Sequence, residues 1–105
     1  MENKQMRNKQ LDKDIIINFL KTHKQLLERE FGVTKIALFG SYARGEQTEK
    51  SDIDFVLETN TPSFTKRCSL KEFLENSFKK QIDLCYFRGM RSFIRHAIEK
   101  ELIYA

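Results

Sequence analysis

The sequence Ala37-Leu38-Phe39-Gly40-Ser41-Tyr42-Ala43-Arg44-Gly45, followed by Lys50-Ser51-Asp52-Ile53-Asp54-Phe55-Val56, decides how the rest of the chain is interpreted. An apolar run enters a Gly-Ser turn, a polar linker follows, and two carboxylates then stand one residue apart. We interpret the first stretch as a strand that leads into an anion-binding turn. The second stretch is interpreted as a strand that carries a divalent-metal site.

The Gly-Ser turn, made of Gly40 and Ser41, has the chemistry of a phosphate-binding turn. Gly40 lacks a side chain, so a phosphate could approach the backbone closely there. Ser41 begins a predicted helical turn over 41–44, whose first amides have no helical partner, and its hydroxyl adds a donor. A Gly-Ser pair after a strand is weak evidence by itself.

The two carboxylates of Asp52 and Asp54 strengthen this interpretation. Residues two apart on a strand point to the same face, roughly 6 to 7 Å apart, and two carboxylates there repel unless a cation lies between them. Oxygen ligands favour magnesium or manganese. The alternative is a solvent-facing pair on an edge strand, but the apolar neighbours Ile53 and Phe55 indicate an interior strand. The spacing Gly-Ser-x10-Asp-x-Asp arises by chance in about one chain in a thousand of this length.

A third carboxylate is normally needed where two metal ions act together. Asp83 is the best candidate, because it interrupts the apolar strand Ile82-Asp83-Leu84. The alternative for Asp83 is a strand-end aspartate that faces water. Asp12 and Asp14 stand at a helix start, where helix capping explains them.

Composition and charge are those of one small domain. The chain has 105 residues, is 40% hydrophobic and carries a net charge of +4 at pH 7. The moderate positive charge suits phosphate-bearing ligands without requiring them. Cys68 and Cys85 lack metal-ligand spacing, and neither a signal peptide nor a membrane-spanning run is evident. We therefore expect a soluble, cytoplasmic protein with packed, reduced thiols and no membrane partner.

Apolar periodicity predicts an α/β fold in which helices pack on a small sheet. Residues 1–11 form a polar tail, and residues 12–105 form a single domain. The predicted elements, in chain order, are a helix over 14–31, a strand over 33–39, a helical turn over 41–44, a strand over 53–57, a helix from 69 to about 78, a strand over 81–87 and a final helix from 92 to about 102.

Helix ends are predicted from capping residues. Asp14 begins the first helix and Gly32 ends it, whereas Ser69-Leu70-Lys71-Glu72 fits a capping box at the start of the next helix. Ser92 is the predicted cap of the last helix, with Glu101 and Leu102 on its apolar stripe. His23 falls beside the apolar stripe of the first helix, and we expect it to pack or meet solvent rather than to act in catalysis.

With these residues in place, the chain resembles the minimal nucleotidyltransferases of the DNA polymerase beta superfamily. The motifs that carry the resemblance are Gly40–Gly45, Ser51–Phe55 and the downstream Asp83, and it extends over nearly the whole chain. It implies a small, mixed three-stranded sheet flanked by helices. It also implies that the phosphates of a nucleoside triphosphate bind at Gly40 and Ser41.

The same resemblance assigns roles to the remaining motif residues. Asp52, Asp54 and Asp83 would hold Mg2+, as one ion or two, with Mn2+ able to substitute, and Asp83 would accept the proton of the acceptor hydroxyl. Arg44 and Ser51 match recurring motif positions and would contact phosphate or brace the loop.

We expect no room in a chain this short for the additional acceptor-binding domain that polymerases or aminoglycoside nucleotidyltransferases carry. The chain is instead similar to the MntA-type proteins. In that family the enzyme transfers AMP from ATP to a tyrosine of a HEPN-domain ribonuclease toxin, HepT, and so acts as its antitoxin. The segment Ile98–Tyr104 also resembles the family's C-terminus. Two alternatives stay open: an antitoxin that acts by binding and occlusion, and a transferase that modifies a small molecule or an RNA end. The basic residues are spread over helices, so nucleic acid is not expected to be the main partner.

Overall fold

A computed structural model describes residues 10–105 and shows nine helices and strands within that range. The predicted tail therefore lies mostly outside the described residues. The elements are α2 (Lys13–Thr22), α3 (Lys24–Phe31), β1 (Val33–Phe39), α4 (Ser41–Arg44), β2 (Ile53–Thr59), α5 (Phe64–Phe78), β3 (Ile82–Tyr86), α6 (Ser92–Glu99) and β4 (Ile103–Tyr104).

The strands form one mixed sheet in the order β3-β2-β1-β4. β1 pairs antiparallel with both β2 and β4, whereas β2 pairs parallel with β3, to which α5 connects it. The predicted α/β fold with a mixed sheet is confirmed, but the predicted strand count of three is wrong. The fourth strand, β4, has two residues, which is too short for a periodic pattern, and only its pairing with Ala37 and Leu38 defines it.

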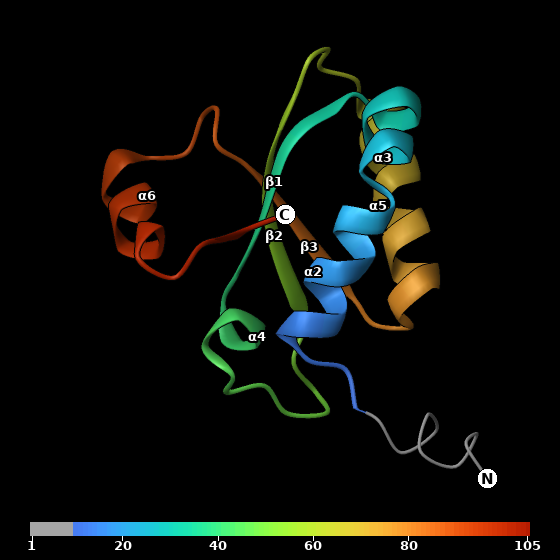
Figure 1. The fold of residues 1–105 in the computed structure, drawn as a ribbon. Coiled ribbons are helices and arrows are strands. Elements are labelled where there is room, and N and C mark those ends of the chain that lie inside the picture. The colour runs from blue at the N-terminus through green and yellow to red at the C-terminus, as the bar shows by residue number, and fades with distance from the viewer. Residues whose placement is uncertain (1–9) are drawn as a thin grey trace, which may run out of the picture.

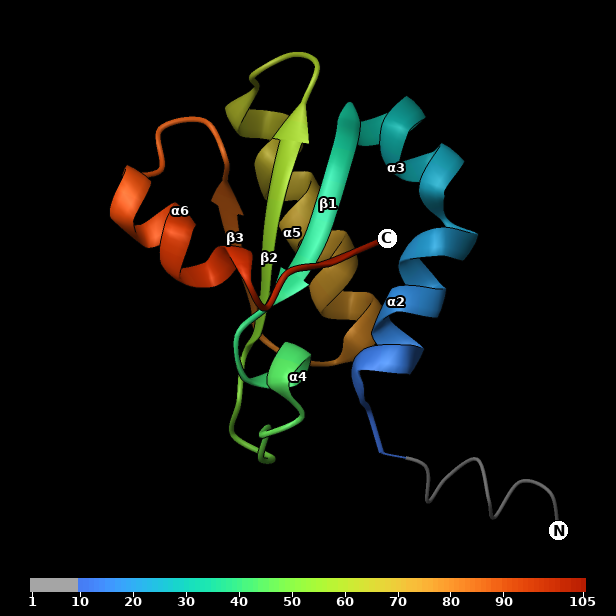
Figure 2. The ribbon, with the colours of Figure 1, turned by 60° about the vertical axis from the view of Figure 1, so that its left-hand side comes forward.

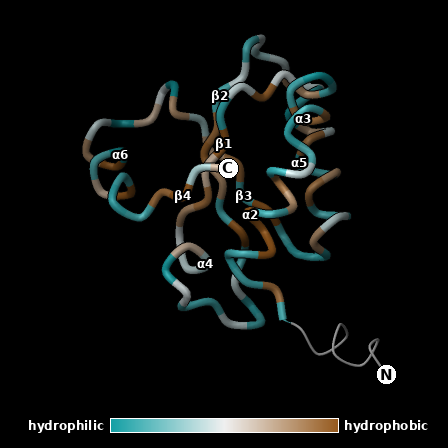
Figure 3. Tube along the Cα trace, viewed as in Figure 1, coloured by the Kyte–Doolittle hydropathy of each residue, from teal (hydrophilic) through white to brown (hydrophobic). Residues whose placement is uncertain are grey.

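The two faces of the sheet are covered differently. Helices α2, α3 and α5 lie on one face, α6 lies on the other, and α4 sits at one end (Figures 1 and 2). The larger core lies on the three-helix side and contains Leu38, Phe55 and Leu74, which are fully buried. A smaller cluster around Ala37 and Val56 lies on the opposite side. Hydrophobic residues accordingly run along the strands in Figure 3.

The first predicted helix is divided into α2 and α3 at His23. This residue leaves helical geometry with φ −102° and ψ 19°. Its Nδ1 lies 2.9 Å from the Phe19 carbonyl oxygen, and its ring stacks on the Phe19 ring, which confirms a packing role. The cap of α2 is Asp12, whose Oδ1 accepts a hydrogen bond from the Ile15 amide, so the prediction of Asp14 as the cap is wrong.

Helix α5 begins earlier than the predicted capping box. Ser63 is its cap and accepts a hydrogen bond from the Lys66 amide at 3.2 Å, which places Ser69 inside the helix. Apolar periodicity does not predict the first turn of α5, because Phe64 is 80% exposed and the buried residues of this helix start only at Leu70. Cys68 is exposed rather than packed, and it and Cys85 are both free thiols.

Helix α6 is shorter than predicted and buries none of its side chains. It runs from Ser92 to Glu99. The capping position is Arg91, which makes no side-chain hydrogen bond there, so the prediction of Ser92 as the cap is wrong. Phe93 is 67% exposed, whereas Leu102, predicted on the helical stripe, lies beyond the helix and packs on the smaller cluster.

The helices within residues 10–105 include none that is both long and apolar enough to cross a membrane.

We predict that Leu74→Ala destabilises the fold by about 2–5 kcal/mol, because it empties a fully buried position between α5 and the sheet. Urea unfolding measures the change. Lys71→Ala, on the exposed side of the same helix, is the matched control and should change stability by less than about 0.5 kcal/mol. Equal losses in the two variants would contradict the core described here.

Candidate active site

The Gly-Ser turn lies directly against one of the candidate metal ligands. Phe39, the last residue of β1, pairs with Asp54 on β2. Gly40 then adopts φ 81° and ψ −158°, a region that is essentially restricted to glycine. A Cβ atom at Gly40 would collide with Asp54 Oδ2. The two halves of the motif are therefore in contact, and the contact requires glycine.

Helix α4 holds this turn at the end of the sheet. Its middle residues, Tyr42 and Ala43, are buried in the larger core, whereas Ser41 is only partly buried. Gly45 ends the helix in the left-handed conformation with φ 75°. Burial of one side of α4 leaves the Ser41 hydroxyl at the accessible start of the helix.

The sheet brings Asp54 and Asp83 side by side. These residues are register partners on the parallel strands β2 and β3. Their neighbours Phe55 and Leu84 point into the larger core, so alternation along the strands turns both carboxylates to the opposite face, the face of α6. Asp52 stands one residue before β2 and is exposed, as is Asp83.

The three carboxylates influence one another electrostatically. Burial, followed by the negative charges of Asp83 and Asp52, raises the pKa of Asp54 from 3.8 to about 6, whereas the positive charge of Arg44 acts in the opposite direction. The ionised forms therefore repel. A cation near Asp54 would relieve this repulsion.

A metal ion fits this donor set in its chemistry. Carboxylate oxygens are the ligands that Mg2+ and Mn2+ prefer, and burial together with the nearby aspartates raises the pKa of the Cys85 thiol, which disfavours a soft thiolate ligand. Within residues 10–105, however, no group of three or more His, Cys, Asp or Glu side chains is gathered closely enough to form a ready-made site.

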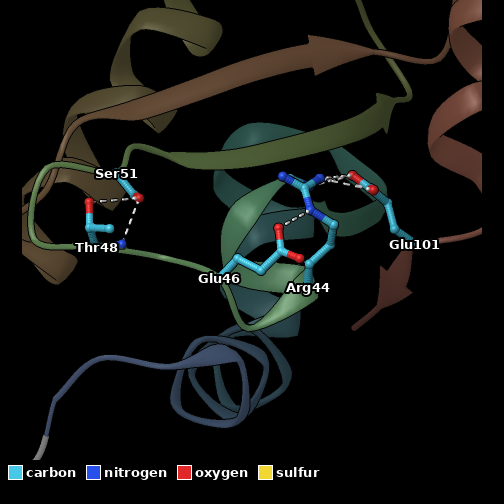
Figure 4. Close-up of polar contacts among 6 residues, drawn as sticks. Arg44, Glu46, Thr48, Ser51 and Glu101 are labelled. Atoms are coloured by element: carbon cyan, nitrogen blue, oxygen red, sulfur yellow. Dashed lines mark hydrogen bonds and ion pairs between the residues drawn. The ribbon is translucent and has the colours of Figure 1, made fainter.

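Arg44 and Ser51 both have partners in the loops around the site (Figure 4). Arg44 Nε donates to Glu46 Oε1 at 2.9 Å, and Arg44 Nη1 lies 3.1 Å from Glu101 Oε1. Hydrogen bonds to these two carboxylates raise the pKa of Arg44. Ser51 Oγ accepts a hydrogen bond from the Thr48 amide at 2.9 Å, a contact that braces the loop before β2.

Sequence reasoning missed Glu101 as a residue of this site. It was placed on the stripe of the last helix, but it follows α6 and reaches the Gly-Ser turn, where the Gly40 amide donates to Glu101 Oε2 at 2.7 Å. That amide was predicted to face a phosphate and instead binds a carboxylate. The sequence offered one signal for a special role of Glu101, its position next to the apolar pair Leu102-Ile103. It offered no signal that Glu101 binds Gly40, which lies 61 residues earlier in the chain.

A family model described as "Nucleotidyltransferase domain" matches residues 20–105. The chain belongs to this family. A candidate protein adenylyltransferase of Methanocaldococcus jannaschii is 43% identical over 93 residues, which cover 85% of this nucleotidyltransferase and 93% of the relative. The protein adenylyltransferase MntA of Thermococcus cleftensis is 37% identical over 90 residues, which cover 85% and 91% of the two chains.

Solved structures show the same fold. The structure of a candidate minimal nucleotidyltransferase matches with a TM-score of 0.75 and 26% identity, covering 91% of this chain and 98% of the other. A variant of the toxin–antitoxin MntA–HpeT matches with a TM-score of 0.63 and 25% identity, covering 91% and 72%. Together these likenesses identify the chain as a minimal, MntA-type nucleotidyltransferase.

We predict that Gly40→Ala disrupts the site far more than Gly45→Ala. Both glycines have positive φ, but only a Cβ at Gly40 meets Asp54, whereas a Cβ at Gly45 meets nothing within 4 Å. Gly45→Ala should therefore lose about 1–2 kcal/mol of stability from backbone strain alone, and Gly40→Ala should lose more. Urea unfolding of both variants tests this. Equal losses would show that the contact between Gly40 and Asp54 is unimportant.

We also predict that Asp54→Asn stabilises the metal-free protein. The pKa of Asp54 in the folded protein, about 6, lies above its ordinary value of 3.8, so the folded state binds the proton more tightly than the unfolded chain. Wild-type stability is therefore lost as pH rises from about 4 to 6. Because water partly screens this half-buried carboxylate, Asp54→Asn should gain about 1 kcal/mol at pH 7.5 and nothing at pH 3.5.

Urea unfolding in EDTA at the two pH values measures this difference. Glu72→Gln, which removes an exposed carboxylate from α5, is the control. A wild-type protein that is more stable than Asp54→Asn at pH 7.5 would contradict the raised pKa of Asp54, which burial and the two neighbouring aspartates cause.

Proposed function

We propose that the domain spanning residues 12–105 transfers AMP from ATP to a tyrosine hydroxyl of a HEPN-type ribonuclease toxin and so acts as its antitoxin. The observation that carries the proposal is the pairing of Asp54 with Asp83 on adjacent strands, directly against the Gly-Ser turn. The relatives named as protein adenylyltransferases support the reaction type. The likeness to MntA–HpeT supports a toxin as the partner.

In this proposal the turn and its helix bind the triphosphate. Ser41 contributes its hydroxyl and Arg44 its positive charge to phosphate oxygens, while Gly40 lets the nucleotide approach the backbone. Ser51 keeps the loop before β2 in place through its bond to Thr48. These groups orient the α-phosphorus toward the aspartates. In phosphoryl-type transfer, positioning of this kind and electrostatic stabilisation supply most of the rate acceleration.

In the same proposal the aspartates bind the metal ion and activate the acceptor hydroxyl. Asp52, Asp54 and Asp83 would hold Mg2+, as one ion or two, or Mn2+ in its place, and the bound cation would neutralise charge on the triphosphate and on the attacking oxygen. Asp83 accepts the proton of the tyrosine hydroxyl. The hydroxyl oxygen then forms a bond to the α-phosphorus, and the bond from that phosphorus to pyrophosphate breaks.

The exposed face of the sheet supports a protein acceptor. Asp54 and Asp83 lie on the face that bears α6, and this helix buries none of its own side chains. A tyrosine presented by a partner could therefore approach across this face. We place the reaction in the cytoplasm, where a reducing environment would keep Cys68 and Cys85 as the free thiols described here.

The direct test is incubation of the protein with its HEPN-domain partner, labelled ATP and Mg2+. We expect the label on the partner. The double variant Asp52→Asn/Asp54→Asn should reduce the rate of labelling at least about 1,000-fold, because its two substitutions remove candidate metal ligands. Lys71→Ala, on the exposed side of α5, is the active control. If the double variant labels the partner as well as the wild type does, the transferase proposal fails.

A second candidate function is neutralisation of the toxin by binding alone. The specific observation in its favour is the apolar surface of α6, where Phe93 is 67% and Ile94 42% exposed. Under this proposal Asp52→Asn/Asp54→Asn should still protect cells from the toxin, whereas Phe93→Ser/Ile94→Ser should not. Loss of protection in the aspartate variant alone would reject occlusion as the mechanism.

A further inference from the structure

The C-terminal segment is fastened to the Gly-Ser turn by one side chain. Glu101 Oε2 accepts a hydrogen bond from the Gly40 amide at 2.7 Å, and the two carboxylate oxygens of Glu101 lie 3.1 and 3.2 Å from Arg44 Nη1. The side chain of Glu101 is only 22% exposed. A single carboxylate therefore joins the backbone of the Gly-Ser turn to the guanidinium of Arg44.

The backbone on both sides of Glu101 is held in place. Its own amide donates to the Ile98 carbonyl oxygen at 3.0 Å, Leu102 packs on the cluster around Ala37 and Val56, and Ile103 pairs with Leu38 on β1. With its backbone held in this way, the carboxylate can leave the turn only by a change of its own side-chain rotamer. Its three hydrogen bonds to Gly40 and Arg44 favour the rotamer that braces the turn.

Arg44 is oriented from two sides by this brace. Glu46 binds its Nε at 2.9 Å and Glu101 binds its Nη1, so the guanidinium is fixed while Nη2 has no partner among residues 10–105. Arg44 belongs to α4, the helix that follows Gly40, and Gly40 lies directly against Asp54. The open edge of the guanidinium is thereby available to an anion near the aspartates.

We propose that Glu101 is a positioning residue of the nucleotidyl-transfer site, which sets the Gly40 peptide and the Arg44 guanidinium in the geometry that binds the triphosphate. The expected effect of Glu101 on the rate of transfer rests on the proposed function. Its expected effects on nucleotide affinity and on the Gly40 amide do not require transfer. The opposing possibility is that Glu101 occupies the phosphate position and competes with the nucleotide. The two possibilities predict opposite effects on nucleotide affinity.

The variants separate the two contacts of Glu101. Glu101→Ala removes both, whereas Glu101→Gln keeps an oxygen for the Gly40 amide and loses the charge that faces Arg44. Glu99→Gln is the matched control, because its side chain is 66% exposed and its recorded contact is with His96 at 3.9 Å. Two measurements need no acceptor: hydrogen exchange of the Gly40 amide by NMR, and the Kd for a non-hydrolysable ATP analogue with Mg2+.

In Glu101→Ala we expect the Gly40 amide to exchange at least about tenfold faster and the Kd to rise about tenfold, as for the loss of a charged hydrogen bond. Glu101→Gln should retain slow exchange at Gly40 and show a smaller rise in Kd. In transfer assays KM for ATP should rise with little change in kcat, whereas a merely unstable protein would lose kcat as its active fraction fell. Glu99→Gln should match the wild type.

An unchanged or lower Kd in Glu101→Ala would overturn the positioning role, and a lower Kd would favour competition. If Glu101→Ala does not fold, an unchanged Kd in Glu101→Gln would likewise overturn the positioning role. A wild-type protein that transfers no AMP would defeat the proposed function, whereas affinity and Gly40 exchange would still decide the role of Glu101.

Discussion

The contact between Gly40 and Asp54 is the constraint on which the rest of the site depends. It places a backbone turn so close to a carboxylate that no Cβ fits between them. The conformation of Gly40 is accessible essentially only to glycine, so the strain of any other residue would act where the proposed phosphate and metal sites adjoin. Antiparallel pairing of β1 with β2 creates this contact by setting Phe39 opposite Asp54.

Electrostatics explains why such a site is costly to maintain. The carboxylates of Asp54 and Asp83 are partners on adjacent strands, and their repulsion adds to the effect of burial in raising the pKa of Asp54. A protein rarely keeps like charges together without a ligand that benefits from them. The repulsion opposes the stability of the fold, and the cation of the proposed function would relieve it.

The two faces of the sheet differ in burial and in the residues that they carry. The face covered by α2, α3 and α5 contains the larger core and supplies most of the burial. The opposite face has a small cluster, the candidate metal ligands and a helix, α6, with no buried side chain. Glu101 links this exposed side to the Gly-Ser turn, so the end of the chain contributes to the site although it adds little to the core.

The sequence by itself determined the α/β class and singled out the Gly-Ser turn with Asp52 and Asp54, because these depend on local periodicity and on a short, specific spacing. It singled out Asp83 as a candidate because that residue interrupts an apolar strand. It did not reveal the division of the first helix at His23, the start of α5 at Ser63 or the strand β4, since exposed turns and two-residue strands leave no periodic signal. Only the tertiary structure showed that Glu101 binds Gly40 and Arg44. The reason is that a hydrogen bond across 61 residues is decided by how the strands pair, and strand pairing depends on the whole sheet rather than on any one segment.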